Sequence, residues 1–472
     1  MSHHAGMFIG ELGGRWWLPG QKETVTGTLH SAWDAWPLVT GIGLLEPATP
    51  EGVFRHFGGQ FVRHELVLGR TVDGKDVSLE SVDVGLRQVH LETPEDASIE
   101  LQAQRAYLGI HFGPEPPAFQ GAEVRVEFLL DFLSRDAIKE DWIYQDARQV
   151  GATLSASRDD ETVIMFPGGT LRVGLDVKLA GDRWRERRIV REARAVFRLD
   201  QPIPPREWLS SYFTPLASLL SLATGEPSVL ESVVFLQPSA EDADTRVELL
   251  WRGEPPQPPR DRLLLPHEIL FTTADPPVPM DQILTSWLRA WKDLRSVLEL
   301  FFATRRKARL YEEHRLLNLT QALEAFHRIR LGGHPTDPAV HADRVKRVLA
   351  TLSAKDRKWA GLPLKKAANE FTLAERLNLL VSAHSWMLGD VVSANPRQFG
   401  DDVALTRNYH THWDKVRGAG ATTGVDLWPL NERLTVLVEA CLLTELGFPE
   451  GAVEECIKRA SGSYRALKLN GL

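Results

Sequence analysis

The sequence is poor in cysteine: Cys441 and Cys456 are the only two in 472 residues. This scarcity excludes a disulfide framework and any zinc site built from several thiolates. The two residues lie 15 positions apart in a stretch with helical periodicity. We therefore expect both to be structural thiols in a reducing compartment.

Long hydrophobic runs are also missing. A transmembrane helix needs about 18 or more consecutive apolar residues. The longest candidate, Leu434–Leu446, is interrupted by Glu439 and Glu445. The N-terminal segment has no basic region followed by an apolar run, which a signal peptide would show. We expect a cytoplasmic protein without membrane contact.

Several common catalytic motifs are absent. The sequence contains no GxxxxGK[ST] phosphate-binding loop, no strand–GxGxxG–helix unit, no HExxH zinc motif and no GxSxG nucleophile motif. The nearest approach to a metal cluster is His334 and His341 with Asp337 and Asp343 close by, but this spacing fits no standard site. We expect neither a metal nor another cofactor.

The sequence pattern before about residue 270 predicts a β domain. Its short β-branched or alternating segments are separated by glycine and proline, as in antiparallel sandwiches and barrels. One helix, Arg206–Thr224, is predicted among them. The predicted strands are Val25–Leu29, Pro37–Leu45, Phe61–Leu68, Ser98–Gln104, Tyr107–Phe112, Ala122–Phe128, Thr162–Phe166, Leu171–Leu179, Ser232–Gln237 and Thr245–Trp251.

From Pro279 onward the apolar residues recur with helical spacing, which predicts a bundle. The predicted fold class is thus α+β, with a β-rich, sandwich- or barrel-like domain over 1–278 and an all-α domain over 279–472. The predicted helices are Asp281–Phe302, Tyr311–Arg330, Ala339–Leu352, Leu373–Leu388, Thr406–Val416, Leu427–Leu446 and Glu450–Ala460.

The net charge of −8 conceals an asymmetry between these halves. Residues 1–280 carry 27 basic and 41 acidic side chains, whereas residues 281–472 carry 28 and 22, a net charge of +6. A basic half favours an anionic partner for that half, although a solvated bundle explains the charge equally well. We hypothesise that the acidic half shields the basic half until a trigger displaces it.

The strongest candidate for chemistry is the segment Arg407–His412 (RNYHTH). A histidine can exchange a proton with the 2′-hydroxyl or the 5′-oxygen of RNA, and a guanidinium can stabilise the charge on the phosphate. Six Arg–His pairs share the R-x(4–6)-H spacing, so spacing alone selects none. This pair differs in having Asn408 beside the arginine and a long apolar helix after it.

The helical geometry of this segment separates its two main residues. On one regular helix, Arg407 and His412 would lie about 140° apart, while Asn408 and His412 would share a face. We therefore expect Arg407 at the N-terminus of its helix, where free backbone N–H groups favour a phosphate.

The order of several motifs resembles a known family. R-N-x-x-x-H late in a helical domain resembles the signature of HEPN ribonucleases. Gly14–Pro19 (GRWWLP) and Val25–Leu29 (VTGTL) resemble the opening of the ApeA N-terminal domain. Leu219–Pro227 and Leu323–Arg328 (LEAFHR) resemble helical stretches of that family. The resemblance covers roughly residues 10–275 and 300–465.

The resemblance implies an antiphage abortive-infection protein, with a β-rich sensing or regulatory domain and a HEPN endoribonuclease. It implies metal-independent cleavage of RNA, with tRNA as the lead substrate, leaving a 2′,3′-cyclic phosphate and a 5′-hydroxyl. It also implies a homodimer or higher homo-oligomer whose HEPN motifs meet in one composite site, and a phage-derived trigger. Carried over by motif, Arg407 and His412 are the catalytic pair, and Asn408 orients the site.

Some neighbouring residues admit two interpretations. Glu324 either lines the site and pairs with Arg407 or is an ordinary solvated acid. His410, inside the motif, is either a surface residue or an RNA contact. A basic run forms either a solvated helix face or a contact with the RNA backbone. Its members are Arg305, Arg306, Lys307 and Arg309.

Two other functions stay open at this stage. One is a catalytically silent HEPN module that binds RNA or a partner protein. The other is a β-sandwich carbohydrate enzyme or binding protein with a helical appendage, for which no particular pair of carboxylates stands out. Four N-terminal tryptophans could stack on bases or sugars, but packing in a β core is the favoured interpretation. They are Trp16, Trp17, Trp33 and Trp36.

Overall fold

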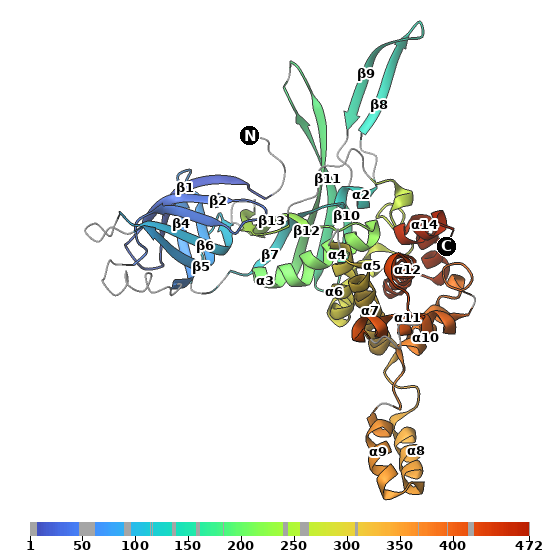
Figure 1. Ribbon diagram of the computed structural model, residues 1–472. Coiled ribbons are helices and arrows are strands. Elements are labelled where there is room, and N and C mark those ends of the chain that lie inside the picture. Colours follow the sequence, from blue (N-terminus) through green and yellow to red (C-terminus); the bar gives the residue numbers. More distant parts are fainter. Residues whose placement is uncertain are drawn as a thin grey trace. The chain divides into compact units, whose positions relative to one another are not determined.

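The computed structural model shows two compact units: residues 1–220 with 228–263, and residues 221–227 with 264–472. The first is rich in strands and the second is helical (Figure 1), which confirms the predicted α+β class. Apart from the side chains of Arg87, Gln88 and Lys366, the structure describes residues 7–46, 62–88, 96–113, 115, 117–134, 138–156, 161–182, 184–238, 244–254, 264–306, 310–366, 368–393, 395–413 and 420–471.

Six strands of the first unit close into an antiparallel barrel. The order around it is β1-β2-β3-β6-β5-β4, and β4 pairs again with β1. Closure leaves none of these strands as an open edge along its full length. The strands are β1 Gly10–Trp17, β2 Val25–Ser31, β3 Leu38–Ile42, β4 Val62–Thr71, β5 Asp76–Gln88 and β6 Ser98–Leu108.

The barrel interior is filled by inward-facing apolar side chains, including Val25 and Leu29 of β2. Trp16 is fully buried there, so its predicted packing role is confirmed, and its indole ring occupies the space where a side chain at Gly69 would lie. Trp17 and Trp33 are half-buried, and Trp36 is 37% exposed. The packing of the barrel core thus requires a residue without a side chain, Gly69 of β4, opposite the large Trp16 of β1.

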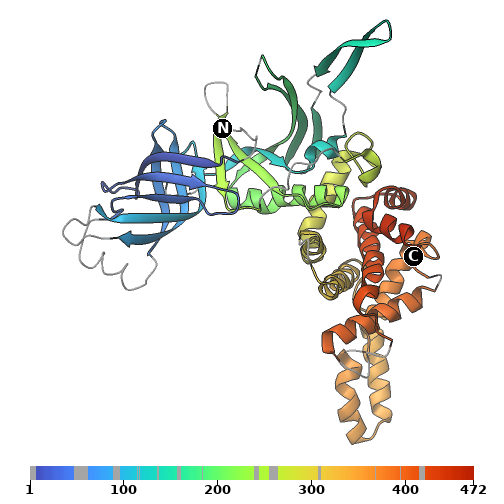
Figure 2. The same ribbon diagram turned by 45° about the horizontal axis from the view of Figure 1, so that its top comes forward.

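A second antiparallel sheet continues from the barrel through β6, in the order β14-β13-β7-β12-β11-β10 (Figure 2). A separate two-stranded hairpin is formed by β8 (Ile138–Gln145) and β9 (Arg148–Ala156), after the short helix α2 (Leu129–Leu133). The sheet strands are β7 Phe119–Val126, β10 Thr162–Phe166, β11 Gly169–Ala180, β12 Arg188–Ile203, β13 Leu230–Gln237 and β14 Thr245–Trp251.

The core of this sheet is aromatic. The rings of Phe119 and Phe235 stack with centroids 4.6 Å apart, and Trp208 stacks on Phe213 at 5.4 Å. The Trp208 indole N–H donates to the Phe119 carbonyl over 3.0 Å. Trp208 and Phe213 belong to a continuous helical stretch made of α3 (Pro205–Trp208), a π-helical turn and α4 (Thr214–Thr224). This stretch confirms the helix predicted within the β half.

The helical unit contains the predicted helices and two that were not predicted, α9 and α14. The single helix predicted over 281–302 is two helices, because the chain leaves helical geometry at Leu294. The helices are α5 Met280–Asp293, α6 Arg295–Arg306, α7 Glu312–Leu331, α8 Pro338–Thr351, α9 Ala354–Lys366, α10 Leu373–Ala383, α11 Pro396–His412, α12 Leu427–Glu445, α13 Glu450–Ala460 and α14 Gly462–Leu469.

The central element of this unit is α12, which is buried on nearly every side. A helix buried in this way must have its polar groups paired. Glu432 pairs with Arg315, Glu439 with Arg305, and the Asn431 amide donates to the Glu312 carbonyl. In the part of the chain that the structure describes, no helix is long and apolar enough to cross a membrane.

Candidate functional site

Helix α11 carries the RNYHTH segment at its C-terminal end. The Asn395 side chain accepts from the Arg397 N–H and Pro396 occupies the first turn, so the helix begins well before Thr406. Arg407 is therefore an interior helical residue, and the prediction that it lies at a helix N-terminus is wrong. No free backbone N–H groups of α11 surround it.

Arg407 is held by two neighbours. Its Nη1 donates to Asn408 Oδ1 over 3.1 Å, and its Nη2 lies 3.8 Å from Glu324 Oε2 on α7. About a third of the Arg407 and Glu324 side chains is exposed, so solvent screens the pair and a ligand can reach the guanidinium. The structure thus brings Glu324 to Arg407; whether it has a role in chemistry remains a prediction.

His412 is the last residue of α11 and is exposed. Trp413 follows in the left-handed conformation, with φ of 53°, and ends the helix. Because His412 lies five residues after Arg407, the two side chains leave the axis about 140° apart, while Asn408 shares the histidine's face. One chain alone therefore does not bring the arginine and histidine to a common point.

His410 is buried, which contradicts its interpretation as a surface residue. Its Nε2–H donates to the Thr422 carbonyl over 3.0 Å, and its ring packs edge-on against Trp413. The Thr422 N–H in turn donates to the Thr406 hydroxyl. His410 therefore anchors the segment that contains Thr422 to α11. Its burial does not fit an RNA contact.

Beneath the site, α7 and α10 are joined by a buried polar pair that the sequence did not single out. Arg376 is completely buried and donates to His327 Nδ1 over 3.1 Å and to the Phe371 carbonyl. Burial, reinforced by the Arg376 charge, lowers the pKa of His327, so its neutral ring accepts this bond. His327 lies within the LEAFHR segment, but no local sequence pattern pointed to Arg376.

The basic run at the end of α6 divides between interior and surface. The Arg305 side chain is only 10% exposed, and its guanidinium donates to Glu439 and to the Ser221 carbonyl. Burial opposes the charge on both partners, lowering the pKa of Arg305 and raising that of Glu439. Arg305 is thus unsuited to the predicted RNA contact. Arg306 is exposed, and Lys307 and Arg309 lie outside the described residues.

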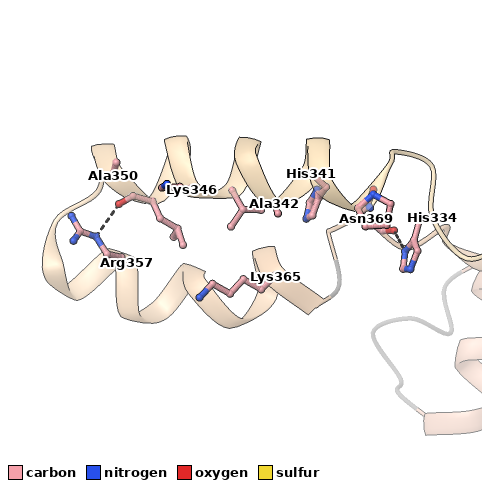
Figure 3. Close-up of a pocket in the computed structure, with 11 residues that line it drawn as sticks. His334, His341, Ala342, Lys346, Ala350, Arg357, Lys365 and Asn369 are labelled. Carbon is pink, nitrogen blue, oxygen red and sulfur yellow. Dashed lines mark hydrogen bonds between the residues drawn. The ribbon is translucent and has the colours of Figure 1, made fainter.

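Of the four residues considered as a metal cluster, three make structural hydrogen bonds in or beside the α8–α9 hairpin, and Figure 3 shows two of them, His334 and His341. Asp337 caps α8 by accepting from two backbone N–H groups. His334 donates from Nδ1 to the Asn369 carbonyl, and His341 donates from Nε2 to the Leu364 carbonyl. Among the described residues, no group of three or more His, Cys, Asp or Glu side chains is placed to hold a metal ion.

Both cysteines are buried, at 2% and 3% exposure. Burial raises the pKa of the Cys441 thiol, and it raises the pKa of Cys456 to about 11. At neutral pH both are therefore protonated and poorly nucleophilic. Their geometry agrees with structural thiols and offers no nucleophile for the site.

Comparison with protein families agrees with this architecture. Residues 11–287, more than half of the chain, match the family model for ApeA N-terminal domain 1. The chain belongs to the ApeA family. Residues 317–452, from α7 to α13, match the Apea-like HEPN model, so this ApeA-like protein carries a C-terminal HEPN domain. Neither the comparison with curated proteins nor that with solved structures gave a match.

Proposed function

We propose that this ApeA-like protein is a metal-independent endoribonuclease that cleaves RNA, with tRNA as the lead substrate, in cytoplasmic antiphage abortive infection. Family membership supports a HEPN-domain defence protein. The observation that carries the catalytic assignment is the end of α11, where Arg407 and Asn408 lie about one turn before His412 and Glu324 faces the arginine.

The proposed reaction is an internal transesterification. The 2′-oxygen of a ribose attacks the adjacent phosphorus, the bond from phosphorus to the 5′-oxygen breaks, and a 2′,3′-cyclic phosphate and a 5′-hydroxyl result. His412 accepts the proton of the 2′-hydroxyl or supplies one to the leaving oxygen. Arg407 stabilises the charge on the phosphate oxygens, and Asn408 holds its guanidinium in place.

We propose that two chains together form the site. The 140° separation on α11 keeps the arginine and histidine of one chain apart. Two α11 C-terminal ends, related by a twofold axis, would place the exposed His412 of one chain beside Arg407 of the other.

The test uses full-length protein and labelled RNA in the presence of EDTA. Replacing Arg407→Ala or His412→Ala should each lower the cleavage rate by at least about 100-fold, the size expected for a lost charge stabiliser or proton-transfer group. Arg397→Ala is the matched control, because Arg397 is exposed in the first turn of the same helix. This variant should cleave RNA at the wild-type rate.

Wild-type rates for both site variants would refute the assignment. Sequencing the 3′ ends would also identify the cut site in tRNA. A terminal phosphate that phosphatase removes without prior acid treatment would contradict the cyclic product, because acid must first open a 2′,3′-cyclic phosphate to a monoester. Mixing Arg407→Ala with His412→Ala chains should restore about a quarter of the activity if one composite site in a mixed dimer keeps an intact pair.

A catalytically silent HEPN module is the alternative. It is favoured by the engagement of Arg407 with both Asn408 and Glu324, which in an isolated chain leaves the guanidinium occupied. Such a module would bind RNA or a protein without cutting. EDTA-resistant cleavage by the purified wild-type chain, lost in both site variants, would exclude it.

We also propose that the N-terminal domain responds to a phage-derived trigger.

A further inference from the structure

The positive charge of the helical half is concentrated in one hairpin. Residues 338–366, which form α8 and α9, contain eight Lys and Arg against two acids, a net charge of +6. This equals the whole net charge of residues 281–472, so the rest of that half is neutral. In both views the hairpin lies apart from the other helices of its unit (Figures 1 and 2).

The two helices enclose a groove with a basic rim and an apolar floor. Its volume is about 700 Å³, and Val345 and Leu349 of α8 contribute to the floor. Lys346 of α8 and Lys365 of α9 line it, and the Lys365 side chain lies along the side of α9 that faces α8 (Figure 3). Arg357 closes one end by donating to the Leu349 carbonyl at the C-terminus of α8. A groove of this kind suits an anion that also carries flat, apolar rings.

The basic side chains of the groove are not neutralised. Among the described residues, no carboxylate lies within 4.0 Å of Lys346 or Lys365. The hairpin contains two acidic residues. One of them, Asp356 in the first turn of α9, accepts a hydrogen bond from the Ser353 hydroxyl. Solvated helix faces usually intersperse charges of both signs, so uncompensated positive charge on two packed helices indicates a polyanionic partner.

An aromatic side chain lies on the same hairpin. Trp359 of α9 is 79% exposed, and Lys355 and Lys358 are close to it in the helix. Exposed aromatic rings with basic neighbours are what single-stranded nucleic-acid sites combine, because bases stack on the ring while the cations contact phosphates.

We propose that the α8–α9 hairpin is an RNA-binding arm that holds the backbone of the substrate at a distance from the residues of α11. The choice of RNA over another polyanion rests on the proposed function. The arm would supply affinity without sequence specificity, since phosphate contacts position a nucleic acid and do not read its bases. Cleavage and retention of the substrate would then reside in different elements of the helical unit.

The test measures RNA affinity by fluorescence anisotropy. Full-length protein carrying His412→Ala serves as the background, so that bound RNA is not consumed, and the probe is a labelled tRNA transcript titrated at several salt concentrations. The hairpin variant is Lys346→Glu with Lys365→Glu. The matched control is Arg289→Glu with Lys292→Glu, two exposed residues of α5, which changes the net charge by the same amount.

The hairpin double variant should bind about tenfold or more weakly. It should also make the negative slope of log affinity against log salt shallower by about 1 to 2, as the loss of two phosphate contacts requires. Trp359→Ala should weaken binding to a single-stranded RNA about fivefold with an unchanged salt slope, because stacking is not ionic. The α5 control should retain the affinity and slope of the background.

Equal affinity in the hairpin and α5 variants would overturn the proposal. So would loss of binding to anionic vesicles in the hairpin variant without loss of RNA binding, which would assign the arm to a lipid surface. Lys346→Gln with Lys365→Gln repeats the test if the reversed charges unfold the hairpin. Hairpin-dependent binding together with wild-type cleavage rates in Arg407→Ala and His412→Ala would refute the nuclease site and leave the arm standing, whereas loss of cleavage in both site variants with hairpin-independent binding would do the reverse.

Discussion

At the scale of single residues, neighbours in the sequence can have opposite environments. Arg305 and Arg306 were indistinguishable in the basic run, yet one is an interior ion-pair partner and the other is exposed. The same applies to His410 and His412, of which the first is buried and the second exposed. Residue type and spacing predicted the motif, but the orientation of each side chain depends on neighbouring helices that no local pattern identifies.

The Arg305–Glu439 pair leads to a stability prediction. Arg305→Ala would leave the Glu439 carboxylate buried without its cation, so the free energy of unfolding should fall by about 3–5 kcal/mol. Arg306→Ala, one residue away and exposed, should change it by less than about 0.5 kcal/mol. Urea denaturation followed by circular dichroism measures both, and equal stabilities of the two variants would show that the pair contributes nothing.

At the scale of secondary-structure elements, the apolar helices were predicted well and the polar ones poorly. The range of α12 was nearly correct because its apolar residues continue for five turns. The first ten residues of α11 include Gly400, Asp401 and Asp402, which locally resemble a loop, so its start was placed too late. Helix α9 contains Pro363 and an exposed, charged surface, and it was missed entirely.

Gly400 marks the place where α11 lies closest to α10. A Cβ at this position would meet the Asn378 side chain and would come 2.6 Å from the Ala374 carbonyl oxygen. Gly400→Ala should therefore force the two helices apart, lower the free energy of unfolding by about 1–3 kcal/mol and reduce cleavage through the displaced Arg407.

Gly361→Ala is the control for this substitution. Gly361 lies inside α9 with open space around it, so alanine should stabilise that helix by about 0.5–1 kcal/mol. Denaturation curves of the two alanine variants should shift in opposite directions. A Gly400→Ala protein as stable as the wild type would mean that α10 and α11 tolerate a wider separation.

At the scale of the whole molecule, the sequence predicted the class of each half and left open whether the β half is a sandwich or a barrel; the structure shows that it contains a closed barrel. Closure depends on β4 pairing with β1, and the sheet depends on β14 pairing with β6, more than 130 residues earlier. Such pairings are set by the combined packing of many strands and leave no local signature. The charge asymmetry was visible in the sequence, whereas its concentration in α8 and α9 required the helix boundaries.

The β-rich unit should respond to pH through Glu231 on β13. Burial, reinforced by the charge of Glu127, raises the pKa of Glu231 to about 7. An unfolded glutamate titrates near 4.3, so between these values the folded state binds more protons than the unfolded state. Stability contributed by this group is therefore present below about pH 4.3 and is lost as the pH rises through 7.

Glu231→Gln should remove this dependence. Relative to the wild type, the variant should gain stability between pH 5 and pH 7.5, by up to about 3 kcal/mol, because the glutamine cannot ionise. Thermal unfolding of the full-length chain at a series of pH values checks this. A constant difference between the two proteins across the range would place the pKa of Glu231 at its ordinary value.

Strand β6 belongs to the barrel and to the open sheet at once. One of its edges pairs with β5 along most of its length; the other is divided between β3, over Ser98–Gln102, and β14, over Arg105–Leu108. Unfolding of β6 would break backbone hydrogen bonds of both subassemblies, so this strand couples the barrel and the sheet into one cooperative unit. Amide hydrogens of β6 should accordingly be among the last to exchange with deuterated solvent, and a ligand that steadies the sheet would slow exchange inside the barrel as well.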